Sequence, residues 1–260
     1  MGYKKIIIKP KREASLLRKH PWVFSGGVAV KEGNPVDGDL VEVFNKRGEF
    51  LGVGHFTDGS IMVRILSFEQ VAIDPVFWEN KFKAAFTYRA SLGFLNDPGT
   101  DCFRLIHAEG DGVPGLIIDL YGDTAVVQCH SIGMYQQLDV IAKALIRVSE
   151  GRIQNVYQKS KETLPNQFSK SIQNGYLIGA AGEGIVNENG HRFIANWETG
   201  QKTGFFLDQR DNRKRLEDFV KDKTVLNTFC YTGGFSVYAL AAGAAQVDSV
   251  DISSKAMEIT

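Results

Sequence analysis

The stretch Val225-Leu226-Asn227-Thr228-Phe229-Cys230-Tyr231-Thr232-Gly233-Gly234-Phe235-Ser236 decides the fold of its part of the chain. Its apolar first half predicts a buried strand over residues 224–229, and its glycine pair predicts a tight turn that opens a helix over 235–242. A second predicted strand, over 246–250, ends in Asp251. Strand, glycine turn, helix, strand and terminal acid in this order are typical of the first unit of a doubly wound nucleotide-binding sheet.

This unit predicts a ligand that contains adenosine. Gly233 and Gly234 allow the backbone to approach a ligand closely at the start of a helix. Asp251, 18 positions after Gly233, is placed to accept hydrogen bonds from ribose hydroxyls. The turn lacks the Gly-x-Gly-x-x-Gly pattern, which disfavours a nicotinamide- or flavin-dependent enzyme. A structural alternative is that the two glycines merely permit a tight crossover and Asp251 caps the last helix.

The chain before this unit predicts two further domains. Short alternating segments separated by Gly and Asn/Asp turns suggest a small β-barrel over residues 1–72. A helix begins at Asp74, and mixed helices and strands over 73–196 predict a central α+β domain. Residues 197–260 contain the nucleotide-type unit, so the predicted fold class is α+β and α/β. A length of 260 residues has room for these three domains.

Composition excludes several classes of protein. With 43% hydrophobic and 23% charged residues, the chain is neither disordered nor fibrous. The longest nearly apolar run, 237–247, is too short to cross a membrane, and the first residues do not read as a signal peptide. Three widely spaced cysteines suggest neither a disulfide framework nor a metal cluster. We therefore expect a cytoplasmic protein with no membrane partner and no metal.

Positive charge is concentrated locally although the whole chain is balanced. Lys+Arg and Asp+Glu number 30 each. Residues 1–20 nevertheless carry seven basic residues against one acid, Glu13. A second basic cluster consists of Arg210, Arg213, Lys214 and Arg215. Either cluster could contact phosphates or could be solvated surface charge.

Four motifs resemble the class I S-adenosylmethionine-dependent methyltransferases. The 225–236 stretch resembles motif I of that class. The segments His20–Phe24 (HPWVF), Gly110–Asp119 (GDGVPGLIID) and Lys202–Arg210 (KTGFFLDQR) are similar to a narrower family. Its members carry an N-terminal PUA domain and make 5-methylcytosine in large-subunit ribosomal RNA. The resemblance covers the whole chain and implies a PUA-like RNA-binding barrel, a central domain and the start of a Rossmann-like methyltransferase domain.

The resemblance also implies a cofactor, S-adenosylmethionine, and a partner, RNA of the 23S type. It assigns three groups of residues to this ligand. The floor under its methionine and ribose parts would be formed by Asn227, Tyr231, Gly233 and Gly234. Its ribose hydroxyls would be held by Asp251. The cofactor or RNA entrance would be covered by Phe206, Asp208 and Arg210. The structural alternatives are core packing for Phe205 and Phe206 and a surface ion pair between Asp208 and Arg210.

The chain departs from this family at its C-terminal end. The resemblance places an Asp-Pro-Pro loop and a nucleophilic cysteine downstream of Thr260, so the methyltransferase domain is expected to be incomplete and its catalytic residues are unknown. Cytosine C5 needs a thiolate added at C6 before it can accept a methyl group. Cys102, Cys129 and Cys230 are each expected to be structural. Residues 1–260 alone are therefore predicted not to methylate RNA.

Other readings stay open. One rival is a non-catalytic RNA-binding protein in which the barrel and basic N-terminus act alone, and guanine methylation by a related branch is another. A zinc site at His107 is disfavoured because no second histidine stands at helical metal spacing, and His55 and His130 are expected to be satisfied polar residues. The sheet edge left open after Asp251 could aggregate or pair two chains into a homodimer.

Overall fold

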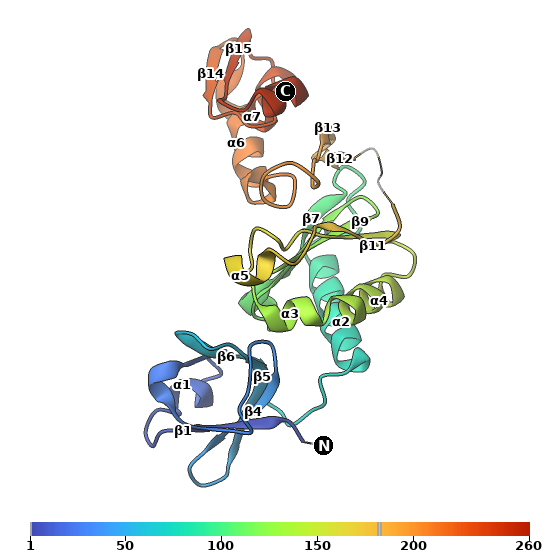
Figure 1. Ribbon diagram of the computed structural model, residues 1–260. Helices are drawn as coiled ribbons and strands as arrows, with labels where there is room; N and C mark the ends of the chain where they lie inside the picture. Colours follow the sequence, from blue (N-terminus) through green and yellow to red (C-terminus); the bar gives the residue numbers. More distant parts are fainter. Residues whose placement is uncertain (1, 181, 183) are drawn as a thin grey trace.

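In a computed structural model, which describes residues 2–180, 182 and 184–260, three bodies follow one another along the chain (Figure 1). The first is a six-stranded sheet in the order β2-β6-β5-β4-β1-β3. Its strands are β1 (Lys4–Ile8), β2 (Trp22–Phe24), β3 (Val28–Glu32), β4 (Leu40–Asn45), β5 (Phe50–Phe56) and β6 (Ile61–Ser67). Strands β1 and β4 are parallel, and the other pairs are antiparallel. Alternating apolar residues of these strands pack with Leu16 of helix α1 (Ala14–Leu17) into a core of their own.

The second body is a five-stranded sheet in the order β11-β10-β9-β8-β7. Its strands are β7 (Cys102–His107), β8 (Leu116–Tyr121), β9 (Thr124–Cys129), β10 (Asn155–Gln158) and β11 (Gly175–Ile178). Figure 1 shows helices α2 (Pro75–Ser91), α3 (Ile132–Gln136) and α4 (Leu138–Val148) gathered on one side of it. The Asp74 side chain caps α2 by accepting a hydrogen bond from the Phe77 amide at 2.9 Å, as its position before Pro75 predicts.

A hairpin and a loop connect the central sheet to the last body. Strands β12 (Ile185–Glu188) and β13 (His191–Ile194) form the predicted hairpin, which turns at Asn189 and Gly190, both with positive φ. Apolar side chains of the hairpin, of the loop and of the central sheet share one core with Tyr238. This core joins the second and third bodies.

The third body contains two parallel strands, β14 (Thr224–Thr228) and β15 (Gln246–Val250). Its helices are α6 (Arg210–Val220), α7 (Gly234–Ala241) and α8 (Ser254–Ile259). The predicted strand, turn, helix and strand are therefore present in the predicted order. The expectation that 224–229 is buried was wrong: Leu226 is 66% exposed and Phe229 is 91% exposed. The reason is that, among the described residues, no second layer covers the face of this two-stranded sheet on which Leu226 lies.

Two smaller differences concern helices. The single helix expected over 131–148 is interrupted at Gln137, which ends α3 and precedes α4. The segment expected to be a loop over 159–170 contains a short helix, α5 (Asn166–Ser169). In the part of the chain that the structure describes, no helix is long and apolar enough to cross a membrane. The proposed domain limits at residues 72 and 196 fall between these sheets and stay a prediction.

Candidate functional site

A cleft of about 790 Å³ lies between the central sheet and the turn that precedes α7. One wall comes from strands β7, β8 and β9, and the other comes from the 229–235 turn and the segment around η3 (Leu207–Gln209). The lining residues that matter below are Arg104, His107, His130, Lys202, Phe206, Asp208, Tyr231 and Gly234. The cleft therefore has one wall rich in cationic and imidazole groups and one wall with aromatic rings and a carboxylate.

The turn before α7 is held in an unusual backbone conformation. Phe229, Tyr231 and Gly233 all have positive φ, with values of 59°, 50° and 74°. This region is costly for a residue with a Cβ, so other contacts must hold Phe229 and Tyr231 there. One such contact is the Tyr231 amide, which donates to the Asp251 carboxylate at 2.9 Å. The Cys230 amide donates to the Val250 carbonyl at 3.1 Å.

Asp251 accepts a second backbone hydrogen bond, from the Ser253 amide at 2.9 Å. The Ser253 and Tyr231 amides, in that order, hold the pKa of Asp251 below its usual value. Each carboxylate oxygen retains a free lone pair, since each accepts one of these bonds. Asp251 is thus an ionised group at the end of β15 that fixes the adjacent turn. The alternative role as a cap of the last helix falls instead to Ser253, whose hydroxyl accepts from the Ala256 amide at 3.3 Å.

Tyr231 links the turn to the loop before η3. Its hydroxyl accepts a hydrogen bond from the Gln201 amide at 3.0 Å. Its ring meets the Phe206 ring edge to face, with centroids 5.1 Å apart. Phe206 is half-buried in the cleft, whereas its neighbour Phe205 is buried against Phe193. The core-packing alternative therefore holds for Phe205 and not for Phe206.

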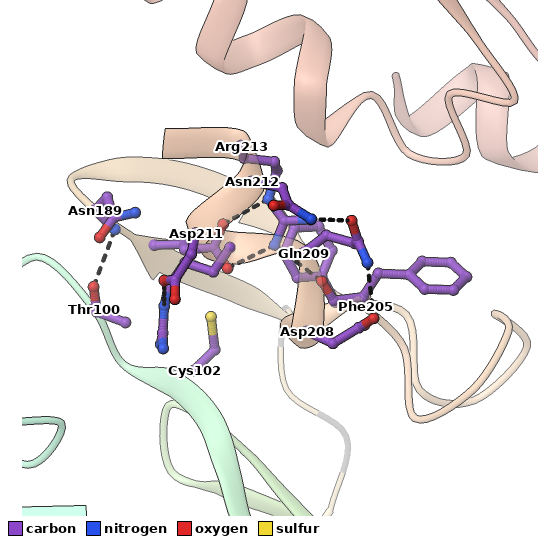
Figure 2. A network of polar contacts seen from close by, with 12 residues as sticks. Thr100, Cys102, Asn189, Phe205, Asp208, Gln209, Asp211, Asn212 and Arg213 are labelled. Atoms are coloured by element: carbon purple, nitrogen blue, oxygen red, sulfur yellow. Dashed lines mark hydrogen bonds and ion pairs between the residues drawn. The ribbon is translucent and has the colours of Figure 1, made fainter. Parts of the chain in front are cut away.

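Asp208 lies within η3 and Arg210 begins α6, and of the two only Asp208 lines the cleft. Asp208 is exposed in the cleft and accepts a hydrogen bond from the Gln209 side chain at 2.9 Å (Figure 2). Arg210 lines a neighbouring depression instead, with its guanidinium 4.4 Å from the Phe94 ring centroid. It approaches Asp211 at 3.6 Å. The alternative of an ion pair between Asp208 and Arg210 is absent from the described residues.

Arg213 has a structural role that sequence reasoning did not find. It was grouped with exposed basic residues, but only 2% of it is exposed, and it forms a two-pronged ion pair with the fully buried Glu188 at 2.8 and 2.7 Å. It also donates to the Phe206 carbonyl at 3.0 Å and stacks on Phe205. Tyr238 completes the network by donating to Glu188 at 3.0 Å. Nothing local in the sequence distinguishes Arg213 from Arg215, because Glu188 lies 25 positions away.

A second buried carboxylate orients the opposite wall. Asp119 is fully buried and accepts from Arg104 Nε at 2.8 Å, from Arg104 Nη2 at 3.0 Å and from the Thr203 hydroxyl at 2.6 Å. These bonds raise the pKa of Arg104 and fix its guanidinium in the cleft. A signal for this pair was present, since Asp119 interrupts the apolar strand 116–121 and a buried carboxylate requires a cationic or donor partner.

The predicted site residues divide into two groups. Those brought together in the cleft are Phe206, Asp208, Tyr231 and Gly234. Those placed behind or beside it are Arg210, Asn227, Gly233 and Asp251. The Asn227 side chain donates to the Ser236 hydroxyl at 2.8 Å, so it ties β14 to α7. Asp251 is connected to the cleft through its bond to the Tyr231 amide.

Of the remaining candidates, the three cysteines and His55 are buried, whereas His107 and His130 line the cleft. All three cysteines are buried, and burial raises the pKa of each thiol, that of Cys129 to about 12. The expectation that His55 is satisfied was wrong, because its two ring nitrogens are buried without a hydrogen-bond partner. Among residues 2–180, 182 and 184–260, no group of three or more His, Cys, Asp or Glu could hold a metal ion.

Comparison with known proteins gives two family matches. Residues 6–68 match a PUA-like domain, which confirms the predicted PUA-like strand domain. Residues 113–259 match the S-adenosylmethionine-dependent methyltransferase family, beginning inside the predicted central domain. Relatives named ribosomal RNA large subunit methyltransferase I include those of Aeromonas hydrophila, Klebsiella pneumoniae and Shewanella amazonensis. They are 39%, 36% and 40% identical to this chain over 253, 261 and 262 residues.

These alignments cover 95%, 99% and 98% of this chain but 63%, 64% and 64% of the relatives, so the chain spans less than two thirds of their length. A crystal structure from Streptococcus mutans described as a SAM-dependent methyltransferase has a TM-score of 0.80 at 25% identity. The superposition covers 98% of this chain and 65% of the Streptococcus mutans chain. A methyltransferase structure in complex with SAH gives a TM-score of 0.81 at 25% identity, with 98% and 64% covered. The family match over 113–259 shows that the chain belongs to the S-adenosylmethionine-dependent methyltransferases.

Proposed function

We propose that this protein transfers a methyl group from S-adenosylmethionine to large-subunit ribosomal RNA in the cytoplasm. The observation that carries the proposal is the convergence of Phe206, Asp208, Tyr231 and Gly234 in one cleft, beside a turn that Asp251 holds in place. The names of the relatives support ribosomal RNA as the substrate. The PUA-like domain supplies a second surface on the same chain for that RNA.

The chemistry of the cleft fits the cofactor. S-adenosylmethionine carries a sulfonium and an ammonium charge, and aromatic faces and carboxylates attract such cations. The edge-to-face pair Phe206–Tyr231 and the exposed Asp208 offer both kinds of group on one wall. Gly234 lines the cleft and lets the start of α7 pack against Arg213, because an added Cβ would lie 3.1 Å from Arg213 Cδ. When bound, the cofactor supplies an activated methyl group.

In this proposal the chain's own residues bind and orient. Asp208 pairs with the ammonium group, and Phe206 with Tyr231 covers the sulfonium. Asp251 accepts hydrogen bonds from the ribose hydroxyls with the lone pairs that its two backbone amides leave free. Gly233 and Asn227 act indirectly by shaping the turn and fixing it to α7. Arg210 lies beside the RNA entrance.

We propose cytosine C5 as the acceptor atom, with the nucleophilic thiolate supplied from outside residues 1–260. The burial and raised pKa of Cys102, Cys129 and Cys230 support this, because a thiol must ionise to attack C6. Residues 1–260 are then expected to bind cofactor and RNA without methylating it. Nucleoside mass spectrometry of large-subunit RNA after incubation checks this, and clear formation of a methylated base would contradict it.

Cofactor binding is tested by calorimetry with S-adenosylhomocysteine. Asp251→Asn is expected to weaken binding at least about fivefold, because it removes a charged acceptor for the ribose. The matched control is Asp248→Asn on the same strand, whose carboxylate contacts only Gln246 among the described side chains and should bind as the wild type does. Equal affinities for both variants would contradict the role of Asp251. No binding by the wild type would overturn the proposed function.

A further inference from the structure

Four basic or imidazole side chains lie in the cleft or next to it, and one of them belongs to the PUA-like domain. Arg64 belongs to β6, His130 follows β9, Arg104 belongs to β7 and Lys202 lies in the loop before η3. Three of them, Arg104, His130 and Lys202, line the cleft. Arg64 adjoins them, because a Cβ added at Gly115 would lie 3.7 Å from its Cδ, and the Gly115 carbonyl accepts from the His130 amide at 2.8 Å.

Arg64 is a charged group without a partner. Its side chain is half-buried and makes no hydrogen bond or ion pair with any residue that the structure describes. Burial lowers the pKa of Arg64, and the only nearby acid that opposes this effect is Glu109. Glu109 is itself engaged, since its carboxylate accepts from the Trp22 indole at 2.8 Å. A guanidinium that has lost part of its hydration without gaining a partner is ready to bind an external anion.

Arg104 is held by Asp119 on one edge and makes only a long contact with His107 on the other. Its Nε and Nη2 are bound to the buried Asp119, as described above. Its Nη1 lies 3.4 Å from His107 Nδ1, on the side that lines the cleft. The orientation of the guanidinium is therefore set before any ligand arrives, which reduces the entropy lost on binding.

His130 lies within reach of the charges of all three cations. Partial burial lowers the pKa of His130, and the charges of Arg104, Arg64 and Lys202 lower it further, while Glu109 opposes them. Arg64 comes from the PUA-like domain, Arg104 from the central sheet and Lys202 from the loop that leads to the last body. Asp208 is the one acid among the described residues that line the cleft, and its carboxylate accepts a hydrogen bond from the Gln209 side chain.

We propose that Arg64, His130, Arg104 and Lys202 form a track for the phosphodiester backbone of single-stranded RNA, leading from the PUA-like domain to the cleft. This inference rests on the proposed function, because it assumes that the substrate is RNA. A single small anion would need one cluster of donors, whereas cations that belong to the PUA-like domain, the central sheet and the connecting loop match a polyanion with a repeated charge. The track would hold the strand in register while the target nucleotide enters the cleft.

The test uses residues 1–260 and a fluorescein-labelled single-stranded RNA of large-subunit sequence, titrated at several KCl concentrations. Arg64→Gln and Lys202→Gln keep the side-chain stems and break no described hydrogen bond. We expect the double variant to bind RNA about tenfold more weakly at low salt. The logarithm of the RNA association constant falls linearly with the logarithm of the KCl concentration. Each lost phosphate contact should also reduce the steepness of this line by about 0.7. The matched control is Lys143→Gln, an exposed lysine of α4 without a described partner, which should change neither quantity.

A second readout separates failure of the track from failure of the proposed function. Calorimetry with S-adenosylhomocysteine should give the same affinity for the wild type and for the single variant Arg64→Gln, because Arg64 lies outside the lining of the cleft, and circular dichroism should give the same unfolding curve. If the wild type binds RNA and cofactor but the double variant behaves like Lys143→Gln, the track is wrong and the proposed function stands. If the wild type binds neither ligand, both are wrong. Equal affinity for double-stranded DNA would overturn the assignment to single-stranded RNA.

Discussion

At the scale of single residues, the Arg213–Glu188 pair is the contact that organises the cleft from behind. Both side chains are buried, so removal of one charge leaves the other without a partner in a region of low polarity. Arg213→Met is therefore expected to lower the free energy of unfolding by about 3–5 kcal/mol. Arg215→Met, an exposed position on the same helix, should change it by less than about 0.5 kcal/mol. Urea unfolding, monitored by circular dichroism, gives the unfolding free energy of both variants. A similar decrease for Arg213→Met and Arg215→Met would show that the buried ion pair contributes little to stability.

His55 should make stability depend on pH. Burial, followed by the charge of Arg64, lowers the pKa of His55 to about 4 in the folded protein, whereas the unfolded value is about 6.5. Between these values the unfolded chain binds a proton that the folded chain does not. Stability is then constant above about pH 6.5 and falls as the pH drops toward 4, by up to about 1.4 kcal/mol per pH unit.

The variant His55→Leu isolates this effect from the other histidines. Leucine is similar in size and removes two buried nitrogens that have no partner. Urea unfolding between pH 4 and pH 7 should show a weaker pH dependence of the unfolding free energy for the variant. Its unfolding should take up about one proton fewer than that of the wild type. Parallel pH profiles for the two proteins would mean that His55 is solvated or hydrogen-bonded in the folded state.

The residue scale is also where sequence reasoning was weakest. A glycine turn after a strand is visible in local sequence and pointed to Gly234, whereas Tyr231 and Asp208 were implied only by the resemblance to the methyltransferases. Sequence reasoning could not separate the buried Arg213 from the exposed Arg215, nor recognise that His55 has no partner. Burial of these side chains depends on segments far away in the chain, so no local pattern carries the information.

At the scale of elements, α3 docks on β5 and joins the PUA-like domain to the central sheet. Gly133 in α3 faces the His55 ring so closely that a Cβ at this position would overlap it. Gly133→Ala should thus destabilise the protein by about 1–3 kcal/mol, through forced displacement of α3 from β5. Gly26→Ala is the control, because nothing lies within 4 Å of its added Cβ. Thermal unfolding compares the two, and equal midpoints would show that the ring moves aside without cost.

The order of elements was largely predictable, whereas their surroundings were not. Periodicity and turn residues placed the hairpin over 184–195 and the strands β14 and β15 correctly, since these signals are local. The same apolar residues predict burial at Leu226, but its side chain is 66% exposed. Hydrophobicity indicates that a face can be covered, but another part of a fold must supply the cover.

At the scale of the whole molecule, the three bodies should differ in local stability. Strands β8 and β9 of the central sheet are buried on both faces along most of their length, whereas β14 and β15 alternate between half-buried and exposed residues. Local opening requires less free energy where few apolar contacts are lost. Amides of residues 224–250 are therefore expected to exchange hydrogen at least about 100-fold faster than those of residues 116–129, measured by hydrogen exchange and mass spectrometry.

The same measurement connects stability to function, because a ligand stabilises the unit that binds it. At a concentration of about 100 times its Kd, S-adenosylhomocysteine should slow exchange in the third body by up to about 100-fold, corresponding to about 2.7 kcal/mol. The protection should centre on residues 229–236 and on the loop at 202–208, which both line the cleft. Strands β1 to β4 of the PUA-like domain should be unaffected and serve as the internal control. Uniform protection of all three bodies would mean that they open together, and protection confined to the PUA-like domain would place the ligand outside the cleft.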